Sequence, residues 1–204
     1  MTEKTLDAFL EELSSAEPTP GGGAAAALVG SLAASLVAMV AGLTIGKRGY
    51  EGVESTMREV RAEAVELRDR LAELVELDIA AFDRVMAAYK LPKDDPARRQ
   101  RVEEALQGAC EIPREVAERS LRVLGLSKTV AEHGKGSAAS DAGAAATLAA
   151  AGLEVALLNV AINLQSLEDG RFKREYGKIR EELAAAGARL KGEALGLVRG
   201  RIRG

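Results

Sequence analysis

The sequence predicts an all-α protein, a single-domain helical bundle in which long amphipathic helices wrap two central small-residue helices. Three observations predict this fold class. The 204 residues are 47% apolar but only 3% aromatic, so the apolar content is mostly aliphatic. Apolar side chains recur at steps of three and four, and stretches of alternating β-branched residues are missing. Glycine and proline separate a few long helical stretches, and the length suits one domain over residues 1–204.

The first two expected helices flank a turn of proline and glycine. Thr5 is suited to cap a short helix, which ends before Pro-Thr-Pro-Gly-Gly-Gly at residues 18–23. Residues 24–45 follow without a charge and are long enough to span a membrane. Eight of them are alanine and five more are glycine, serine or threonine. We therefore interpret this stretch as a buried helix of a soluble bundle, packed closely on all sides.

The remaining expected helices cover about residues 53–90, 95–124, 127–133, 140–167 and 171–203. Pro92 separates the first two, and Asp95 with Pro96 is a typical start signal for the second. Pro113 is expected to bend or break that helix because proline cannot donate its backbone hydrogen bond. Ser140 is expected to cap the next one, which is nearly uncharged.

The composition excludes several functional classes. The net charge is −3, from 28 Lys plus Arg against 31 Asp plus Glu, which argues against a nucleic-acid partner. One cysteine, Cys110, and one histidine, His133, exclude a disulfide framework and a zinc site built from these residue types. Residues 1–3 include an acid and begin no apolar stretch, so we expect no secretory signal and a cytoplasmic location.

Asp78 interrupts the apolar stripe of the long helix. The other positions of this stripe, at steps of three and four, are all apolar: Val53, Met57, Val60, Ala64, Leu67, Leu71, Leu74, Phe82, Val85 and Tyr89. A core-facing carboxylate is costly unless it is paired, hydrogen-bonded or protonated, and burial raises its pKa. Such groups concentrate at functional sites. Asp78 is therefore a functional carboxylate, or it caps a neighbouring helix or pairs with a lysine.

Two weaker signals accompany Asp78. Asn159 and Asn163 lie four residues apart on one face of an apolar helix. Buried amides need partners, so these side chains either bind the amide edge of a heterocycle or tie helices together. Gly21, Gly22 and Gly23 precede a helix, where backbone N–H groups form an anion site in principle; these glycines also permit close packing.

Several motifs together resemble the cyclodeaminase/cyclohydrolase family, which comprises the C-terminal half of formiminotransferase-cyclodeaminase and stand-alone proteins. The matching segments are Pro-Thr-Pro-Gly-Gly-Gly-Ala at 18–24, Gly-Lys at 46–47, Asp-Ile-Ala-Ala-Phe at 78–82, Leu-Pro-Lys at 91–93, Ser-Asp-Ala-Gly-Ala-Ala at 140–145 and Asn-Val-Ala-Ile-Asn-Leu at 159–164. The resemblance covers nearly the whole chain. In one departure, Gly-Lys-Gly-Ser at 134–137 stands where the family usually has an asparagine-rich loop.

The resemblance implies a dimeric all-α enzyme of one-carbon metabolism that acts on a tetrahydrofolate derivative and needs no metal or redox cofactor. In the cyclodeaminase reaction, 5-formimino-tetrahydrofolate closes to 5,10-methenyl-tetrahydrofolate and releases ammonia. In the cyclohydrolase reaction, water opens the methenyl ring to 10-formyl-tetrahydrofolate. The motifs slightly favour the cyclodeaminase. An alternative from another class is a folate-binding or purely structural helical homodimer without catalysis.

The resemblance also implies roles for individual residues. Asp78 matches the position of a proton-accepting aspartate, and a carboxylate with a raised pKa suits both base and acid steps. Asn159, Asn163 and Asp141 would face the substrate. The glycine turn of residues 21–23 would shape the pocket, and two cations would meet the folate glutamate carboxylates: Lys47 and Lys135.

Overall fold

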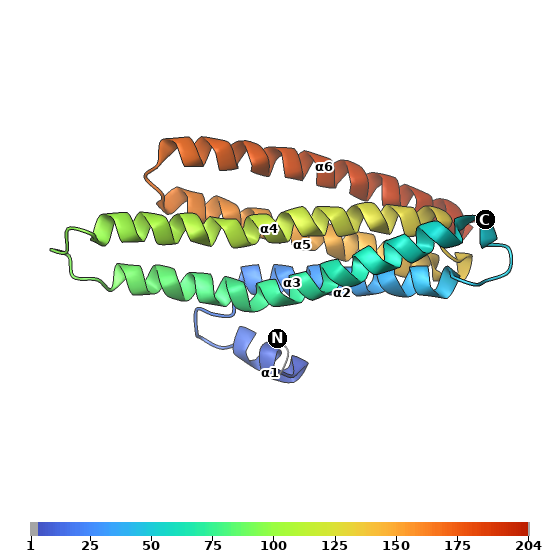
Figure 1. Cartoon of the computed structure of the whole chain (residues 1–204), viewed down its shortest axis with the longest axis horizontal. Coiled ribbons are helices and arrows are strands. Elements are labelled where there is room, and N and C mark those ends of the chain that lie inside the picture. Colours follow the sequence, from blue (N-terminus) through green and yellow to red (C-terminus); the bar gives the residue numbers. More distant parts are fainter. Residues whose placement is uncertain (1–3, 204) are drawn as a thin grey trace.

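The computed structural model describes residues 4–203, which form six α-helices and no strand (Figure 1). The helices are α1 (Leu6–Leu13), α2 (Gly22–Thr44), α3 (Glu54–Tyr89), α4 (Arg98–His133), α5 (Ala139–Ser166) and α6 (Gly170–Arg203). Two single turns of 3₁₀ helix, Glu51–Val53 and Gly136–Ala138, precede α3 and α5. Residues 1–3, on which the expectation of no secretory signal depends, lie outside the described residues.

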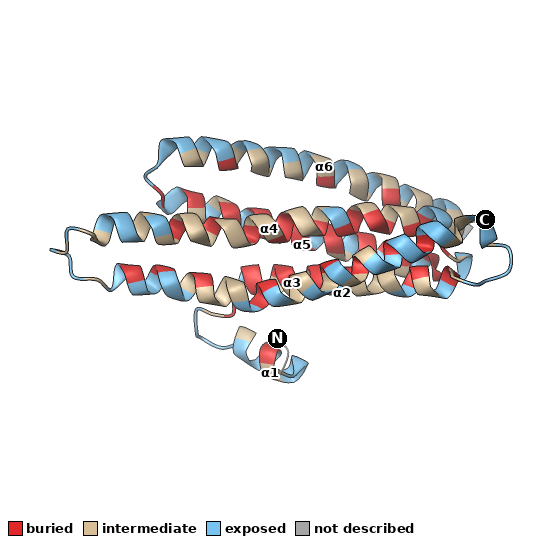
Figure 2. Ribbon diagram, in the orientation of Figure 1, coloured by how far each residue is buried: buried red, intermediate tan, exposed pale blue. Residues whose placement is uncertain are grey.

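Four long helices form an antiparallel bundle. Helices α2, α3, α4 and α5 pack in turn against one another, and α6 packs against α4 and α5. Buried residues gather on the helix sides that face each other, as Figure 2 shows. The all-α fold class is confirmed, and the two small-residue helices α2 and α5 each contact three other helices.

Glycines and a serine allow the small-residue helices to approach closely. A Cβ atom on Gly152 of α5 would lie 3.1 Å from the carbonyl oxygen of Ala26 in α2. A Cβ atom on Gly30 of α2 would lie 2.9 Å from the Ser120 hydroxyl of α4. Larger side chains would push these helices apart, so the small residues of α2 and α5 determine the spacing of the bundle.

Helix α4 is continuous, which corrects two predictions. We expected a bend or break at Pro113 and a separate helix over 127–133, but α4 runs unbroken through both. A proline leaves the carbonyl four residues earlier without its helical donor. That carbonyl belongs to Ala109, and the Asn163 amide nitrogen of α5 donates to it at 2.7 Å. The neighbouring helix therefore satisfies the group that Pro113 leaves unbonded.

The bundle helices have unequal lengths, and this positions the site. Helix α2 has 23 residues whereas α3 has 36. Gly23, near the start of α2, lies against Asp78 of α3, so α3 continues for about 16 Å beyond this level. There, helices α3 to α6 share a second, smaller core: Val85, Leu106, Cys110, Val160, Leu164, Leu167 and Tyr176. Asp78 lies at the point on α3 where the contact between α3 and α2 ends.

Two stretches, Gly22–Thr44 and Gly136–Ser166, are long and apolar enough to cross a membrane. Within an apolar 18-residue part of each stretch, 56% and 50% of the residues respectively are buried inside the bundle. Core helices of soluble proteins have the same length and composition. One side of each helix remains exposed, with Leu32 and Leu158 50% and 67% accessible.

Candidate active site

Asp78 meets the N-terminus of helix α2. Its side chain is half-buried on α3, and the backbone N–H of Ala24 donates a hydrogen bond to its carboxylate. The first N–H groups of a helix lack partners within the helix and attract an anion. The glycine turn that the sequence marks as an anion site thus has the chain's own Asp78 beside it.

Gly23 is the residue that allows this contact. A Cβ atom at position 23 would lie 2.2 Å from Asp78 Oδ1 and 2.6 Å from the other carboxylate oxygen. No real Cβ atom approaches an oxygen so closely, so any larger residue would displace the carboxylate. The neighbouring Gly22 differs, because a Cβ atom there would lie 3.4 Å from Asn159 Nδ2, an ordinary contact.

Burial raises the pKa of the Asp78 carboxyl group, and the hydrogen bond from Ala24 opposes this effect without cancelling it. Burial disfavours the charged form of a carboxyl group, whereas a hydrogen bond to the carboxylate favours it. A carboxyl group whose pKa is raised toward neutral pH can serve both as a proton acceptor and as a proton donor, which an ordinary aspartate does less well. This electrostatic environment suits an acid/base catalyst.

The two asparagines lie at the same end of the bundle as Asp78. Asn159 contacts Gly22, and its amide nitrogen donates to the Val155 carbonyl of its own helix at 2.9 Å. The Asn163 amide nitrogen bonds to Ala109 of α4. Asn163 therefore connects two helices, which is one of the two roles that the sequence indicates for it. Binding of substrate by either amide stays a prediction.

Lys47, Lys135 and Asp141 lie at the opposite end of the bundle. Lys47 follows α2, and Asp141 lies in the first turn of α5. The ends of α2 are about 33 Å apart along a helix of 23 residues. Lys47 and Asp78 of the same chain therefore lie at opposite ends of α2. Binding of the substrate by these three residues stays a prediction.

The loop that departs from the family pattern lies at this far end too. The backbone N–H of Lys135 donates to the Thr44 hydroxyl at 2.8 Å, and that of Gly136 to the Tyr50 hydroxyl at 3.0 Å. The Arg201 guanidinium donates to the Gly134 carbonyl at 2.6 Å. These bonds connect residues 134–136 to α2 and α6. Within one chain, the altered loop lies at the opposite end of the bundle from Asp78.

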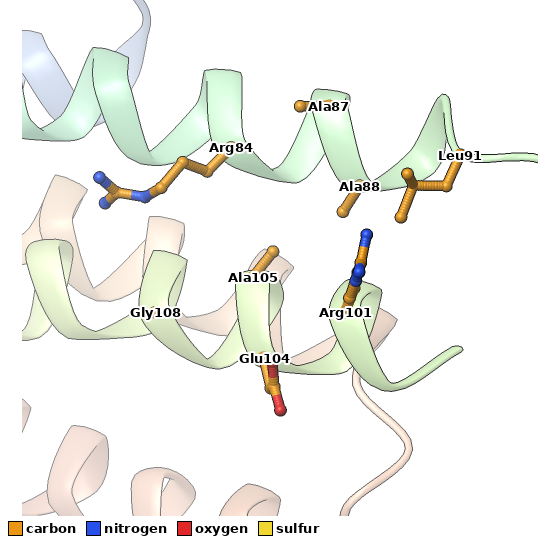
Figure 3. A pocket seen from close by; sticks show the side chains of 8 residues that line it. All are labelled: Arg84, Ala87, Ala88, Leu91, Arg101, Glu104, Ala105 and Gly108. Carbon is orange, nitrogen blue, oxygen red and sulfur yellow. The ribbon is translucent and has the colours of Figure 1, made fainter. Parts of the chain in front are cut away.

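A surface cavity of about 430 Å³ lies between the end of α3 and the start of α4 (Figure 3). Alanine and glycine line much of it, and Arg84 and Arg101 extend into the space between the two helices while Glu104 points away. Asp78 does not line this cavity. We therefore place the candidate active site at Asp78 and the α2 N-terminus, where the perturbed carboxylate is.

The sequence did not reveal two parts of this site. One is the backbone N–H of Ala24, which carries no side-chain signal. The other is the end of α3 beyond α2, where Met86 and Tyr89 are 39% and 42% exposed. Comparing the expected lengths of the two helices, 24–45 against 53–90, would have indicated that α3 extends further than α2.

Comparison with known proteins identifies a family for the chain. The sequence profile described as "Formiminotransferase-cyclodeaminase" matches residues 5–182. A methenyltetrahydrofolate cyclohydrolase of Methylorubrum extorquens is 43% identical over 190 residues, which are 91% of each chain. The formimidoyltransferase-cyclodeaminase of Gallus gallus is 34% identical over 183 residues, but the match spans only 34% of that longer protein.

A solved structure has the same fold. The crystal structure of formiminotetrahydrofolate cyclodeaminase from Thermotoga maritima superposes with a TM-score of 0.92, at 31% identity, and the match covers 98% of both chains. The similarity extends from α1 to α6, so it includes the helices that position Asp78. The relatives thus carry names from both branches of the family.

Proposed function

This chain belongs to the formiminotransferase-cyclodeaminase family of folate one-carbon enzymes, and we propose that it hydrolyses 5,10-methenyl-tetrahydrofolate to 10-formyl-tetrahydrofolate. One observation carries the chemistry: a half-buried carboxylate, Asp78, with a raised pKa, held at the start of α2. The choice of hydrolysis is supported by the cyclohydrolase relative, which is 43% identical and matches over 91% of its own length.

In the proposed mechanism, Asp78 acts first as a base. Its carboxylate accepts a proton from water as the oxygen attacks the methenyl carbon between N5 and N10. The ionised carboxylate also stabilises the positive charge on this bridge in a partly dehydrated environment. Asp78 then returns a proton to N5 as the C–N5 bond breaks, and the hydroxyl proton of the intermediate leaves as the formyl C=O forms. No metal ion or redox cofactor takes part in these steps.

A second candidate function is the cyclodeaminase reaction. N10 of 5-formimino-tetrahydrofolate would attack the formimino carbon, and Asp78 would move a proton from N10 to the departing ammonia. The structural similarity to the Thermotoga maritima cyclodeaminase supports this alternative. A non-catalytic folate-binding or structural protein is the third, and Asp78 argues against it because leucine would be less costly on that stripe.

Absorbance of the methenyl group distinguishes the three functions. We expect the purified chain to accelerate the loss of methenyl-tetrahydrofolate absorbance well above the spontaneous rate, with Asp78→Asn protein as the control. A rise in absorbance from 5-formimino-tetrahydrofolate would instead identify the cyclodeaminase. No change with either substrate would overturn both enzymatic proposals. If a folate then raised the melting temperature of the chain, the result would support a non-catalytic folate-binding protein.

We further propose that the enzyme is a homodimer that uses the exposed side of α2 and α5, the α2–α5 face. This face carries five exposed large apolar side chains: Leu32, Met39, Leu43, Leu158 and Ile162. Helix α2 contains no charged residue, and α5 contains only Asp141 and Glu154. A self-complementary apolar surface suits a two-fold dimer, and its burial also suits a cytoplasmic protein without a membrane partner.

In an antiparallel dimer, each active site would contain residues of both chains. Two chains that pack through the middle of the α2–α5 face would bring the Lys47 and Lys135 end of one chain beside the Asp78 end of the other. The lysines of one chain could then meet the glutamate carboxylates of a folate bound at Asp78 of the other chain.

Mixed dimers test this arrangement. We expect coexpression of Asp78→Asn chains with Lys47→Ala/Lys135→Ala chains to give heterodimers with about half the wild-type activity, because one of two sites keeps both elements. Each variant alone would be strongly impaired. Separate affinity tags isolate the heterodimer, and sedimentation establishes its mass. Heterodimers without recovered activity would contradict a shared site, and a monomeric mass would overturn the dimer itself.

A further inference from the structure

The few aromatic residues of the chain divide into two groups. There are three phenylalanines, three tyrosines and no tryptophan. Four of the six have contacts that explain them: Phe9 is buried in the core, the Tyr50 hydroxyl bonds to Gly136, and Phe172 stacks on Tyr176 with ring centroids 4.1 Å apart. Of the remaining two, Phe82 is half-buried and Tyr89 is exposed.

Phe82 and Tyr89 extend from the catalytic carboxylate along one side of α3. They follow Asp78 by four and eleven residues, which places them about 6 Å and 16 Å further along the helix and within about 40° of its face. Met86 lies on the same side and is 39% exposed. This side of α3 faces α2 from the start of α3 up to Asp78. The antiparallel helix α2 starts at the level of Asp78, so the end of α3 after Asp78 has no part of α2 beside it.

Polar groups lie beside Asp78 on α2 and α5, and apolar side chains follow it along α3. Asn159 and the first N–H groups of α2 lie at the start of α2. Phe82, Met86 and Tyr89 lie further along α3, where the Tyr89 hydroxyl is the single polar side-chain group among the three. The substrate has a matching division, because its one-carbon bridge joins a polar pterin ring to an apolar aminobenzoyl ring.

We propose that Phe82 stacks on the aminobenzoyl ring of the folate substrate and that Tyr89 contacts the same ring or its glutamate extension. This inference rests on the proposed folate activity. With the one-carbon bridge at Asp78, the pterin would face Asn159 and the start of α2, and the aminobenzoyl ring would lie along α3. Phe82 and Tyr89 would thus be positioning residues that hold the bridge at the carboxylate.

Kinetics give the first test. We expect Phe82→Leu, which keeps an apolar side chain but removes the ring, to raise KM about 2- to 10-fold with little change in kcat, as loss of one stacking contact predicts. Tyr89→Leu, which removes the second ring, is expected to raise KM in the same way. A merely structural role would instead lower the melting temperature and change kcat and KM together.

A single tryptophan gives a direct test of contact. The chain has none, so Phe82→Trp introduces a unique fluorophore into the proposed binding surface. We expect 5-formyl-tetrahydrofolate, a stable analogue, to quench its emission strongly. Ile202, which is 63% exposed at the far end of α6, provides the matched control. The emission of Ile202→Trp is expected to fall only by the amount that absorption of light by the ligand causes.

The outcomes separate this proposal from the proposed function. Calorimetry with the unmodified chain measures binding of the same analogue. Binding without selective quenching of Phe82→Trp, or an unchanged KM in Phe82→Leu, would overturn the stacking proposal while the folate activity stands. Absence of both binding and turnover in the unmodified chain would overturn both.

Discussion

Replacing Asp78 by asparagine is expected to lower kcat by about 10² to 10⁴-fold, the usual contribution of a general acid/base. Asparagine has nearly the same shape, and its carbonyl oxygen can still accept the hydrogen bond from Ala24. It cannot accept a proton from water or return one to N5. Steady-state turnover of methenyl-tetrahydrofolate, with substrate binding measured separately, checks this result.

The same substitution is expected to leave the chain at least as stable at neutral pH. Burial raises the folded-state pKa of Asp78 above its unfolded value. The folded chain therefore holds the proton more tightly, and stability falls as pH rises from the unfolded pKa through the folded pKa. Above the folded pKa this cost is fully present, so its removal in Asp78→Asn should maintain or raise the melting temperature there.

Thermal melts at acidic and neutral pH check the sign. The stability difference between the variant and the wild type should shrink as pH falls below the unfolded pKa, where both states carry a protonated carboxyl group. The acid limb of the wild-type pH–rate profile should also lie above the usual aspartate range. An Asp78→Asn protein that folds and keeps near-native turnover would refute the catalytic role.

Replacing Gly23 by alanine is expected to lower kcat by about 10²-fold, because a displacement near 1 Å at the reacting groups can have this effect. The added Cβ atom would lie 2.2 Å from Asp78 Oδ1, so the carboxylate must move. Alanine favours a helix more than glycine does, and the fold should persist. Circular dichroism and kinetics measure the two effects separately.

Gly22→Ala is the matched control. It adds the same methyl group to the adjacent residue, but the new atom would lie 3.4 Å from Asn159 Nδ2, within ordinary contact distance. Because the Asp78 carboxylate stays in place, we expect near-native kcat and a small gain in stability from the higher helix propensity. Any effect on the pterin beside Asn159 would change KM instead. Equal activity in both variants would show that Gly23 does not position the carboxylate.

The sequence predicted the parts of the site but not how they meet. Periodicity identified Asp78 as the polar residue of an apolar stripe, and the three glycines marked the start of a helix. Both conclusions follow from local patterns along one helix. The contact between Asp78 and Gly23 depends on the register between α2 and α3, which side-chain packing determines and which no local pattern encodes.

Register also explains the distance between Asp78 and Lys47. The sequence indicated suitable charges for folate carboxylates, but charge type carries no information about which end of a bundle a residue occupies. Because α2 is about 33 Å long and Lys47 follows its last turn, one chain keeps these residues apart.

The continuity of α4 shows a similar limit. Pro113 is a local signal for a helix bend or break, and we interpreted it in that way. The Ala109 carbonyl obtains its hydrogen bond from Asn163, 54 residues away in sequence. A donor on another helix overrides the local preference, and only the tertiary structure reveals it.

The end of α3 extends beyond the start of α2, and this has a consequence for evolution and design. The active site results from a missing length of helix, because two or three additional turns before Gly22 would cover Asp78, Phe82 and Tyr89 and produce an ordinary closed four-helix bundle. The position at which one helix begins therefore controls access to the site. Insertions or deletions in residues 14–21 could change substrate size without any change in the catalytic residues.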